Sequence, residues 1–133
     1  MVSFVVVTHG RLAEELVNTA EHIVGKLDRL AAVAISPDCS PESVRENISK
    51  AVDSVRNEGG VLILTDLFGG TPSNISISLL DEKNIEVVTG VNLPMMIKLA
   101  TLRSDMELVE VAQYLKAYGR ENISVAGDLL KET

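Results

Sequence analysis

The chain has 133 residues, 46% of them hydrophobic and 23% charged, with a formal net charge of −7 at pH 7. These values predict one soluble globular domain over residues 1–133 and argue against a nucleic-acid partner, which requires a basic surface. No apolar run approaches the ~20 residues of a membrane-spanning helix. The start of the chain lacks the basic leader of a signal peptide. The single cysteine, Cys39, excludes an internal disulfide, and we expect a cytoplasmic protein.

The first half of the chain alternates between apolar strands and amphipathic helices. An unbroken apolar run around residues 5–8 predicts a strand covered on both faces. Apolar residues then recur every three or four positions, which predicts a helix that ends near Gly25. Residues 30–35 form the next predicted strand. Ser40 followed by Pro41 predicts the start of a second helix, with a cap and a proline in the first turn.

The second half continues the same alternation. The predicted elements are a strand at 61–65, a helix from Thr71 to about Leu80, a strand at 85–89 and a helix from about Leu93. Ser104 and Glu107 have the spacing of a capping box, which predicts a last long helix that closes near Gly119. Residues 123–127 predict a short final strand.

This order of elements predicts an α/β fold, a single doubly wound domain with a mostly parallel central sheet and helices on both faces. Such sheets bind ligands beyond the carboxyl ends of their strands. His9 follows the first strand, Asp66 follows the third, and residues 90–92 follow the fourth. We therefore expect these residues to meet at one edge of the sheet.

The residue types at this edge favour anion chemistry. Gly69 and Gly70 allow positive φ angles that turn backbone N–H groups inward, and Thr71 begins a helix beside them. A neutral His9 imidazole oriented by Asp66 could act as a nucleophile or base. The residues supply no recognisable metal-ligand set and no nucleotide-binding motif, so we expect neither metal nor cofactor.

Plainer interpretations of each residue remain open at this point. His9 could cap a helix, Asp66 could bond its own backbone, and the two glycines could form only a turn. The second histidine, His22, lies within the first predicted helix, where a surface position without a role is expected.

Three stretches in this order, VVVTHG, LTDLFGGTPSN and TGVNLPM, resemble one family over essentially the whole chain. It is the IIA component of the mannose-type (mannose/fructose/sorbose) sugar phosphotransferase system. The resemblance implies a phosphotransferase component that works without a cofactor. In that family, the histidine after the first strand accepts a phosphoryl group from the phosphocarrier protein HPr. It then passes the group to a IIB component, and the membrane is involved only through the IIC and IID components.

Carried over residue by residue, the resemblance makes His9 the phosphoryl acceptor and Asp66 the aspartate that holds it. Thr71, with the N–H groups around Gly69 and Gly70, would bind the phosphoryl oxygens.

Three further residues are candidates for this site. Phe68 stands where the family often carries an aromatic residue, and it could pack beside the site or simply in the core. Arg11 could touch the phosphoryl group or a partner, or be a solvated residue at the start of a helix. Asn92 lies in the loop after the fourth strand.

The resemblance further implies a homodimer in which a carboxyl-terminal strand, here 123–127, is exchanged between subunits. Many relatives continue through a linker into a IIB domain. This chain ends at Thr133 without such a linker, so we expect no fused IIB domain and a separate IIB partner. An alternative function is a regulatory IIA-like module, whose phosphorylated His9 signals metabolic state to a kinase or transcription regulator. A histidine-phosphatase-like protein would need arginine where Thr8 stands, and a receiver-like domain would need acidic residues after the first strand.

Overall fold

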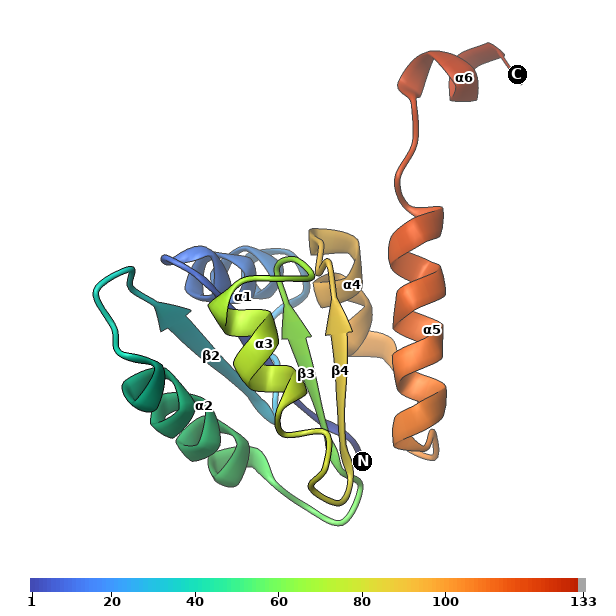
Figure 1. The fold of residues 1–133 in the computed structure, drawn as a ribbon. Coiled ribbons are helices and arrows are strands. Elements are labelled where there is room, and N and C mark those ends of the chain that lie inside the picture. Colours follow the sequence, from blue (N-terminus) through green and yellow to red (C-terminus); the bar gives the residue numbers. More distant parts are fainter. Residues whose placement is uncertain (132–133) are drawn as a thin grey trace.

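Four parallel strands form one sheet in the order β2-β1-β3-β4 in the computed structural model, which describes residues 1–131 (Figure 1). The strands are β1 (Ser3–His9), β2 (Leu30–Ile35), β3 (Val61–Thr65) and β4 (Ile85–Thr89). Val7 of β1 lies opposite Val33 of β2 and Thr65 of β3, and Thr65 lies opposite Thr89 of β4. This register brings the carboxyl ends of all four strands to one edge.

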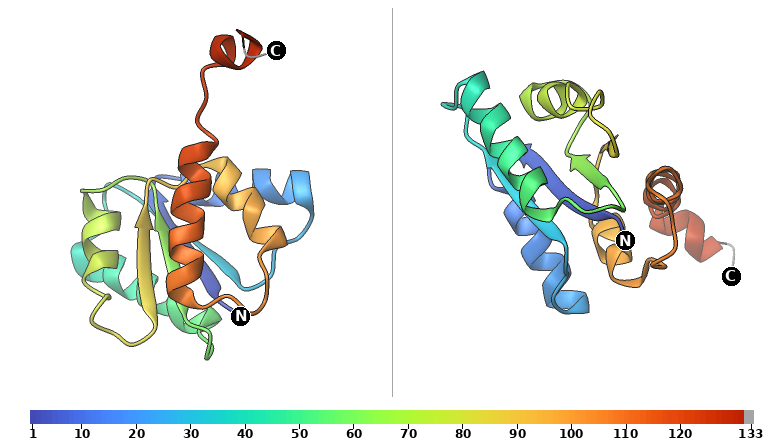
Figure 2. Two further views of the ribbon diagram at one scale, coloured as in Figure 1. Left: turned by 90° about the vertical axis from the view of Figure 1, so that its right-hand side faces the viewer. Right: turned by 90° about the horizontal axis from the view of Figure 1, so that it is seen from below.

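Helices cover both faces of the sheet (Figure 2). The helices are α1 (Leu12–Val24), α2 (Pro41–Val55), α3 (Thr71–Ile77), α4 (Leu93–Lys98), α5 (Leu108–Glu121) and α6 (Ala126–Lys131), with a 3₁₀ turn η1 (Leu99–Thr101). Helices α1, α4 and α5 pack on one face and α2 and α3 on the other. The predicted α/β fold with a doubly wound parallel sheet is confirmed.

The strand residues divide between two cores because successive side chains point to opposite faces. Phe4 and Val6 of β1 belong to the core under α1, α4 and α5. Val5 and Val7 belong to the core under α2 and α3. This burial on both faces explains the unbroken apolar run of β1. Within residues 1–131, no helix has the length and apolar character needed to cross a bilayer.

Helix starts and ends follow the predicted signals in part. Ser40 caps α2 as expected, since its side chain accepts a hydrogen bond from the Ser43 N–H over 3.1 Å. Helix α3, however, ends at Ile77 rather than near Leu80. The chain continues there in tighter turns, in which the Leu80 N–H donates to the Ile77 carbonyl over 3.0 Å.

The capping box and the end of α5 were predicted wrongly. The box is formed by Glu107 and Glu110, not Ser104 and Glu107, because the chain still turns at the buried Met106 before the helix begins. Gly119 does not close the helix, which continues to Glu121. Gly119 is buried against Met95, and a Cβ added at Gly119 would lie only 2.6 Å from the Met95 Sδ.

The predicted final strand at 123–127 is also wrong. Residues 123–125 leave α5 without regular structure, and α6 follows them, away from the sheet (Figure 1). The Val125 carbonyl accepts hydrogen bonds from Asp128 and Leu129, which turn the chain into this helix. Ile123 and Val125 are exposed, so within the described chain their apolar side chains lack the sheet against which a strand would pack.

Candidate functional site

The centre of the site is a histidine–aspartate pair at the carboxyl edge of the two central strands. His9 is the last residue of β1, and Asp66 follows β3 directly. Oδ2 of Asp66 lies 2.8 Å from Nδ1 of His9 and accepts the His9 main-chain N–H over 3.0 Å. Oδ1 accepts the N–H of Leu67 over 3.0 Å. Both ends of the carboxylate are therefore held, and the two residues come together as predicted.

Hydrogen bonding keeps Asp66 ionised. Burial by itself raises the pKa of Asp66, but the hydrogen bonds from the His9 ring and main chain, and the attraction to that ring, outweigh it. The net effect is a pKa below the ordinary value of 3.8. An ionised carboxylate only accepts hydrogen bonds, so it favours the neutral tautomer with the proton on Nδ1, in which Nε2 keeps its lone pair. The His9 side chain is 51% exposed and that of Asp66 10%, so the carboxylate is shielded and the ring is accessible.

The glycine loop after β3 lies against the other side of the imidazole. An added Cβ at Gly70 would be 3.1 Å from both Cε1 and Nε2 of His9, and Gly70 has a φ of +85°. Only glycine combines this backbone conformation with such a close approach. The N–H groups of Gly70 and Thr71 bond to no other residue of the described chain. The loop thus brings the Gly70 backbone close to Nε2 and leaves the N–H groups of Gly70 and Thr71 unbonded within the described chain.

The predicted roles of Gly69 and Gly70 differ in the structure. The N–H of Gly69 donates to Oγ of Ser73 over 3.2 Å, whereas that of Gly70 stays free. Gly69 therefore shapes the loop in this conformation.

Two buried hydroxyl groups that sequence reasoning missed hold the site in place. Ser73 braces the glycine loop through Gly69, and Thr8 accepts the N–H of Ala13 over 2.7 Å, which anchors the start of α1 next to His9. A hydroxyl immediately before the histidine and one within the GGTPS turn were the available signals, since Ser and Thr commonly cap helix starts and turns.

Within residues 1–131, none of the three further candidates forms a hydrogen bond or ion pair with the His9 ring. Arg11 is exposed and pairs with Glu14 over 3.6 Å. Phe68 is 78% exposed, so the alternative of core packing is wrong. Asn92 has a structural role, since its Oδ1 accepts the N–H of Met95 and its Nδ2 donates to the Gly119 carbonyl over 3.1 Å.

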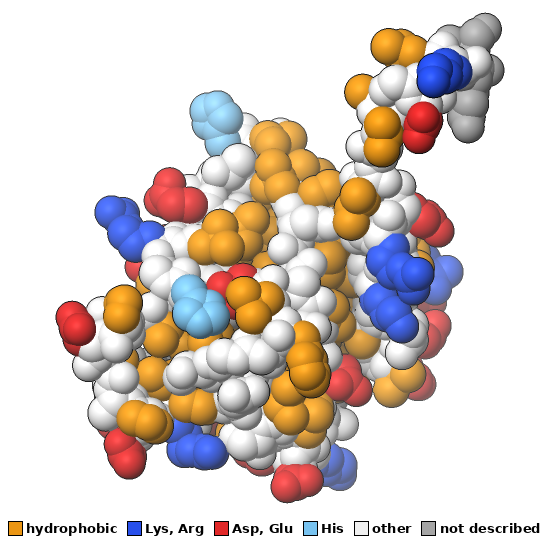
Figure 3. Space-filling view, turned by 45° about the horizontal axis from the view of Figure 1, so that its top comes forward, with side chains coloured by type: hydrophobic (Ala, Val, Ile, Leu, Met, Phe, Trp, Pro, Cys, Tyr) orange, Lys and Arg blue, Asp and Glu red, His pale blue; other side chains and the backbone are white. Residues whose placement is uncertain are grey.

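Apolar side chains surround this end of the molecule. Leu12, Leu67 and Phe68 are exposed at 46%, 48% and 78%, and each lies within three positions of His9 or Asp66 in the sequence. Figure 3 shows hydrophobic side chains gathered on this face, and the two histidine side chains well apart on the surface. His22 is exposed on α1, as expected for a residue without a role in the site.

Comparison with known proteins agrees with the fold and with the motifs. The family model described as "PTS system fructose IIA component" matches residues 3–116. The chain is 28% identical to the PTS system fructose-specific EIIA component of Bacillus subtilis over 99% of this chain and 91% of that protein. It is 31% identical to the PTS system mannose-specific EIIAB component of Escherichia coli over 78% of this chain, but it spans only 32% of that protein. The crystal structure of phosphotransferase system component EIIA from Streptococcus agalactiae superposes with a TM-score of 0.86. That likeness has 25% identity and covers 96% of this chain and 99% of the other.

These matches, together with the fold, define a phosphotransferase component of the sugar phosphotransferase system. The chain belongs to the mannose/fructose/sorbose family of IIA components. Members of this family take part in the phosphoryl relay of sugar uptake, which brings them into contact with a phosphocarrier and with IIB- and IIC-type components.

Proposed function

We propose that His9 carries the phosphoryl group on Nε2, receiving it from phosphorylated HPr and passing it to a IIB component. One observation carries the proposal: Asp66 binds Nδ1 of His9 at 2.8 Å, which leaves Nε2 as the free nucleophile beside the glycine loop. Phosphoryl transfer requires mainly such positioning and electrostatic support.

The transfer step uses the two ring nitrogens differently. The lone pair of Nε2 attacks phosphorus and forms an N–P bond, while the bond from phosphorus to the donor breaks and its electron pair stays with the donor. Nδ1 keeps its proton throughout. The ring becomes positively charged, and the ionised Asp66 stabilises that charge. Attack by a nucleophile of the IIB component on phosphorus then breaks the Nε2–P bond and returns the electron pair to His9.

The glycine loop binds the phosphoryl oxygens in this proposal. Gly70, which approaches the imidazole, and its neighbour Thr71 provide the donors. These are their two unbonded N–H groups and the hydroxyl of the exposed Thr71. The N–H of Gly69 joins them only if its bond to Ser73 opens. Backbone N–H groups suit this role because they bind anions without carrying a charge.

The exposed apolar side chains around His9 support docking of protein partners. Leu12, Leu67 and Phe68 offer an apolar surface through which both HPr and IIB could approach the same imidazole.

Intact-protein mass spectrometry tests the acceptor assignment. The wild-type protein, His9→Ala and His22→Ala are incubated with phosphoenolpyruvate, enzyme I and HPr. We expect an acid-labile gain of one phosphoryl group in wild type and His22→Ala, and no gain in His9→Ala. Because the His9 side chain is half exposed, its removal should leave the fold intact, which circular dichroism checks. Unchanged labelling of His9→Ala would refute the acceptor assignment.

A second incubation separates transport from regulation. Addition of the cognate IIB component to the labelled protein should remove the label and transfer it to IIB. Retention of the label would instead favour the regulatory module, because both functions need the same acceptor and differ only in where the group goes next.

We also propose that the protein forms a homodimer through the free edge of β4. This strand is at the end of the sheet, and exposed sheet edges favour pairing with another chain. A groove of about 440 Å³ runs between β4 and α5, and Thr89, Lys116 and Ile123 are among its lining residues. The exposed segment 123–125 of a second copy has the apolar side chains to add a strand there.

Multi-angle light scattering tests the dimer. We expect the mass of two chains for wild type and dissociation by Val125→Asp. Val109→Asp is the matched control, since Val109 is equally exposed, 66% against 67%, but lies at the other end of α5. A monomeric wild type at high concentration would disprove the dimer without affecting the assignment of His9.

A further inference from the structure

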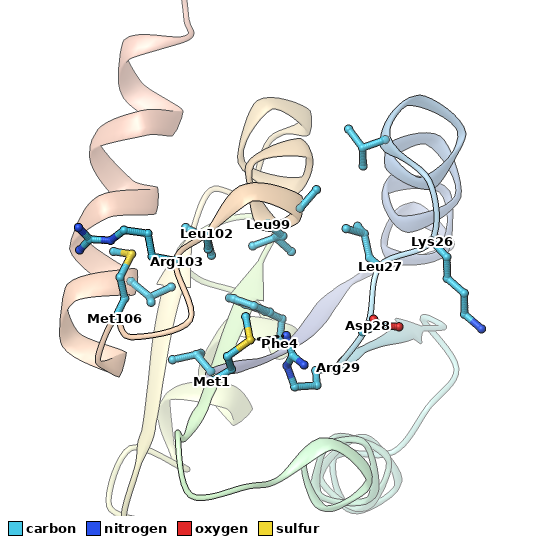
Figure 4. Close-up of a pocket in the computed structure, with 14 residues that line it drawn as sticks. Met1, Phe4, Lys26, Leu27, Asp28, Arg29, Leu99, Leu102, Arg103 and Met106 are labelled. Atoms are coloured by element: carbon cyan, nitrogen blue, oxygen red, sulfur yellow. Dashed lines mark hydrogen bonds between the residues drawn. The ribbon is translucent and has the colours of Figure 1, made fainter.

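A cavity of about 220 Å³ lies at the amino-terminal edge of the sheet, the end opposite His9 (Figure 4). It is bounded by the start of β1, the loop before β2, the turn after α4 and the start of α5. None of the residues assigned to the phosphoryl site lines it, so the cavity is independent of the proposed function.

The lining of this cavity is part apolar and part polar, and its apolar part is incompletely closed. Phe4, Met106 and Val111 line it and are buried. Leu27 and Leu102 are only half-buried, and they belong to the same core cluster. An apolar group placed between these leucines would complete their burial, which is the main favourable term for an apolar ligand.

Arg29 lines the cavity with a guanidinium group whose one hydrogen bond to a side chain of the described chain is to a sulfur atom. Its Nη2 donates to Sδ of Met1 over 2.9 Å, and a thioether is a weak acceptor. No carboxylate within residues 1–131 pairs with this guanidinium. Figure 4 shows the Arg29 side chain beside Met1 at the cavity, whereas Lys26 and Arg103 extend away from it.

The backbone holds Arg29 in this place. Its φ of +53° is uncommon for a residue other than glycine, and its carbonyl accepts the Phe4 N–H over 2.8 Å. The main chain of Arg29 is therefore held in place next to the cavity.

The surrounding charges leave this region more positive than the rest of the chain. Lys26, Arg29 and Arg103 line the cavity with one carboxylate, Asp28, and Arg103 also pairs with Asp105 over 3.5 Å. The whole chain, by contrast, has a net charge of −7.

We propose that this cavity binds a small amphipathic anion, an apolar chain of about five carbon atoms bearing one carboxylate. The apolar chain lies against Phe4, Leu27 and Leu102, and the carboxylate displaces the Met1 sulfur from Arg29. An arginine–carboxylate pair is bidentate and stronger than the thioether contact that it replaces. The size agrees with cavities of roughly 150 Å³ that accept benzene.

The four methionines provide a test, because two of them line the cavity and two do not. Met1 and Met106 are lining residues, whereas Met95 and Met96 are buried elsewhere in the core. The protein labelled with ¹³C-methyl methionine is titrated with hexanoate at constant ionic strength, with 1-hexanol and hexylamine as comparators. We expect hexanoate to shift the Met1 and Met106 methyl signals and to leave those of Met95 and Met96 in place.

Comparators and variants test the role of charge. Hexanol, hexylamine and the Arg29→Gln variant should each bind about tenfold more weakly, the loss of one charge-assisted contact. Ala100→Phe, at an exposed position of the lining, should block the shifts. Arg45→Gln on α2 removes an equal charge far from the cavity and should bind hexanoate like wild type.

Two results would overturn the proposal. Equal binding of hexanol and hexanoate, unaffected by Arg29→Gln, would mean an apolar crevice without anion selectivity. Shifts of all four methionine signals would mean non-specific binding. Melting temperatures of the unliganded variants show whether each remains folded, and phosphoryl labelling of His9 is expected to be unchanged in all of them.

Discussion

Two glycine-containing loops at the carboxyl edge of the sheet have similar sequence features but differ in how their polar groups are hydrogen-bonded. The loop after β3 contains Gly70, with a φ of +85°, and the loop after β4 contains Gly90, with a φ of +88°. Each leads into a short helix with proline in its first turn. Their shared sequence features therefore do not distinguish a binding loop from a structural one.

The difference lies in where the polar groups of each loop are used. After β4, the N–H groups of Gly90 and Val91 both donate to the Thr65 carbonyl over 2.9 Å, and Asn92 bonds to α4 and α5. After β3, Gly70 faces the His9 imidazole and its N–H stays free. A loop whose donors are satisfied by the fold supports structure, and one whose donors remain free beside a nucleophile can bind a ligand.

Asp66→Asn should cause the largest loss of phosphoryl transfer, because it removes the carboxylate that binds His9 beside the loop after β3. Oδ2 accepts the His9 main-chain N–H and also binds Nδ1, so an amide oxygen at that position turns its NH₂ group against the Leu67 N–H, and the reverse orientation turns it against the His9 main-chain N–H. Either orientation removes the negative charge that would stabilise the phosphorylated ring. We expect phosphoryl transfer from HPr to slow by roughly 10²-fold, measured by rapid-quench labelling. Asp38→Asn, at an exposed aspartate in the turn before α2, is the control. A wild-type rate would make Asp66 merely structural.

Gly70→Ala and Gly90→Ala compare the two loops directly. Both substitutions place alanine at a strained positive φ, with an expected loss of about 1–3 kcal/mol in the free energy of unfolding. Only at Gly70 does the new Cβ meet the imidazole, at 3.1 Å, whereas at Gly90 nothing lies within 4 Å. We expect transfer to slow about tenfold in Gly70→Ala alone. Equal rates in the two folded variants would contradict the positioning role of Gly70.

Asn92→Ala should show the opposite behaviour. It removes the cap of α4 and the bond to the Gly119 carbonyl, so we expect a loss of about 1–2 kcal/mol in urea unfolding. The transfer rate should stay within a factor of about two, because the Asn92 side chain is already used by the fold. Asn47→Ala, on the exposed face of α2, controls for loss of an amide. A slower phosphoryl transfer with little change in urea unfolding would show that Asn92 acts in the phosphoryl site.

The smallest effect concerns the pH dependence of stability. Because the folded-state pKa of Asp66 lies below its ordinary value of 3.8, this group adds stability fully present above that value. The contribution is lost as the pH falls through the lowered folded-state pKa. We therefore expect the urea midpoint of wild type to fall slightly more than that of Asp66→Asn between pH 6 and pH 3. Parallel curves would mean that the carboxylate contributes nothing net to folding.

The sequence predicted the strands better than the ends of the helices. Runs such as 61–65 are apolar because both faces of a parallel sheet are covered, and this requirement is visible in the residues themselves. Glu107 and Gly119 were misjudged because their positions depend on contacts with Met106 and Met95, which only the folded chain brings close.

The phosphoryl site also has features that the sequence predicts and features that only the folded structure shows. The residue types and the strand ends determined that His9 and Asp66 meet, since parallel strands bring their carboxyl ends to one edge. Only the tertiary structure decided that Gly70 rather than Gly69 keeps a free donor, that Phe68 is exposed and that Asn92 belongs to the scaffold. The four strands of the sheet follow from local pattern because both of their faces are buried. The use of each polar group depends instead on which distant residue the folded chain places within hydrogen-bond distance.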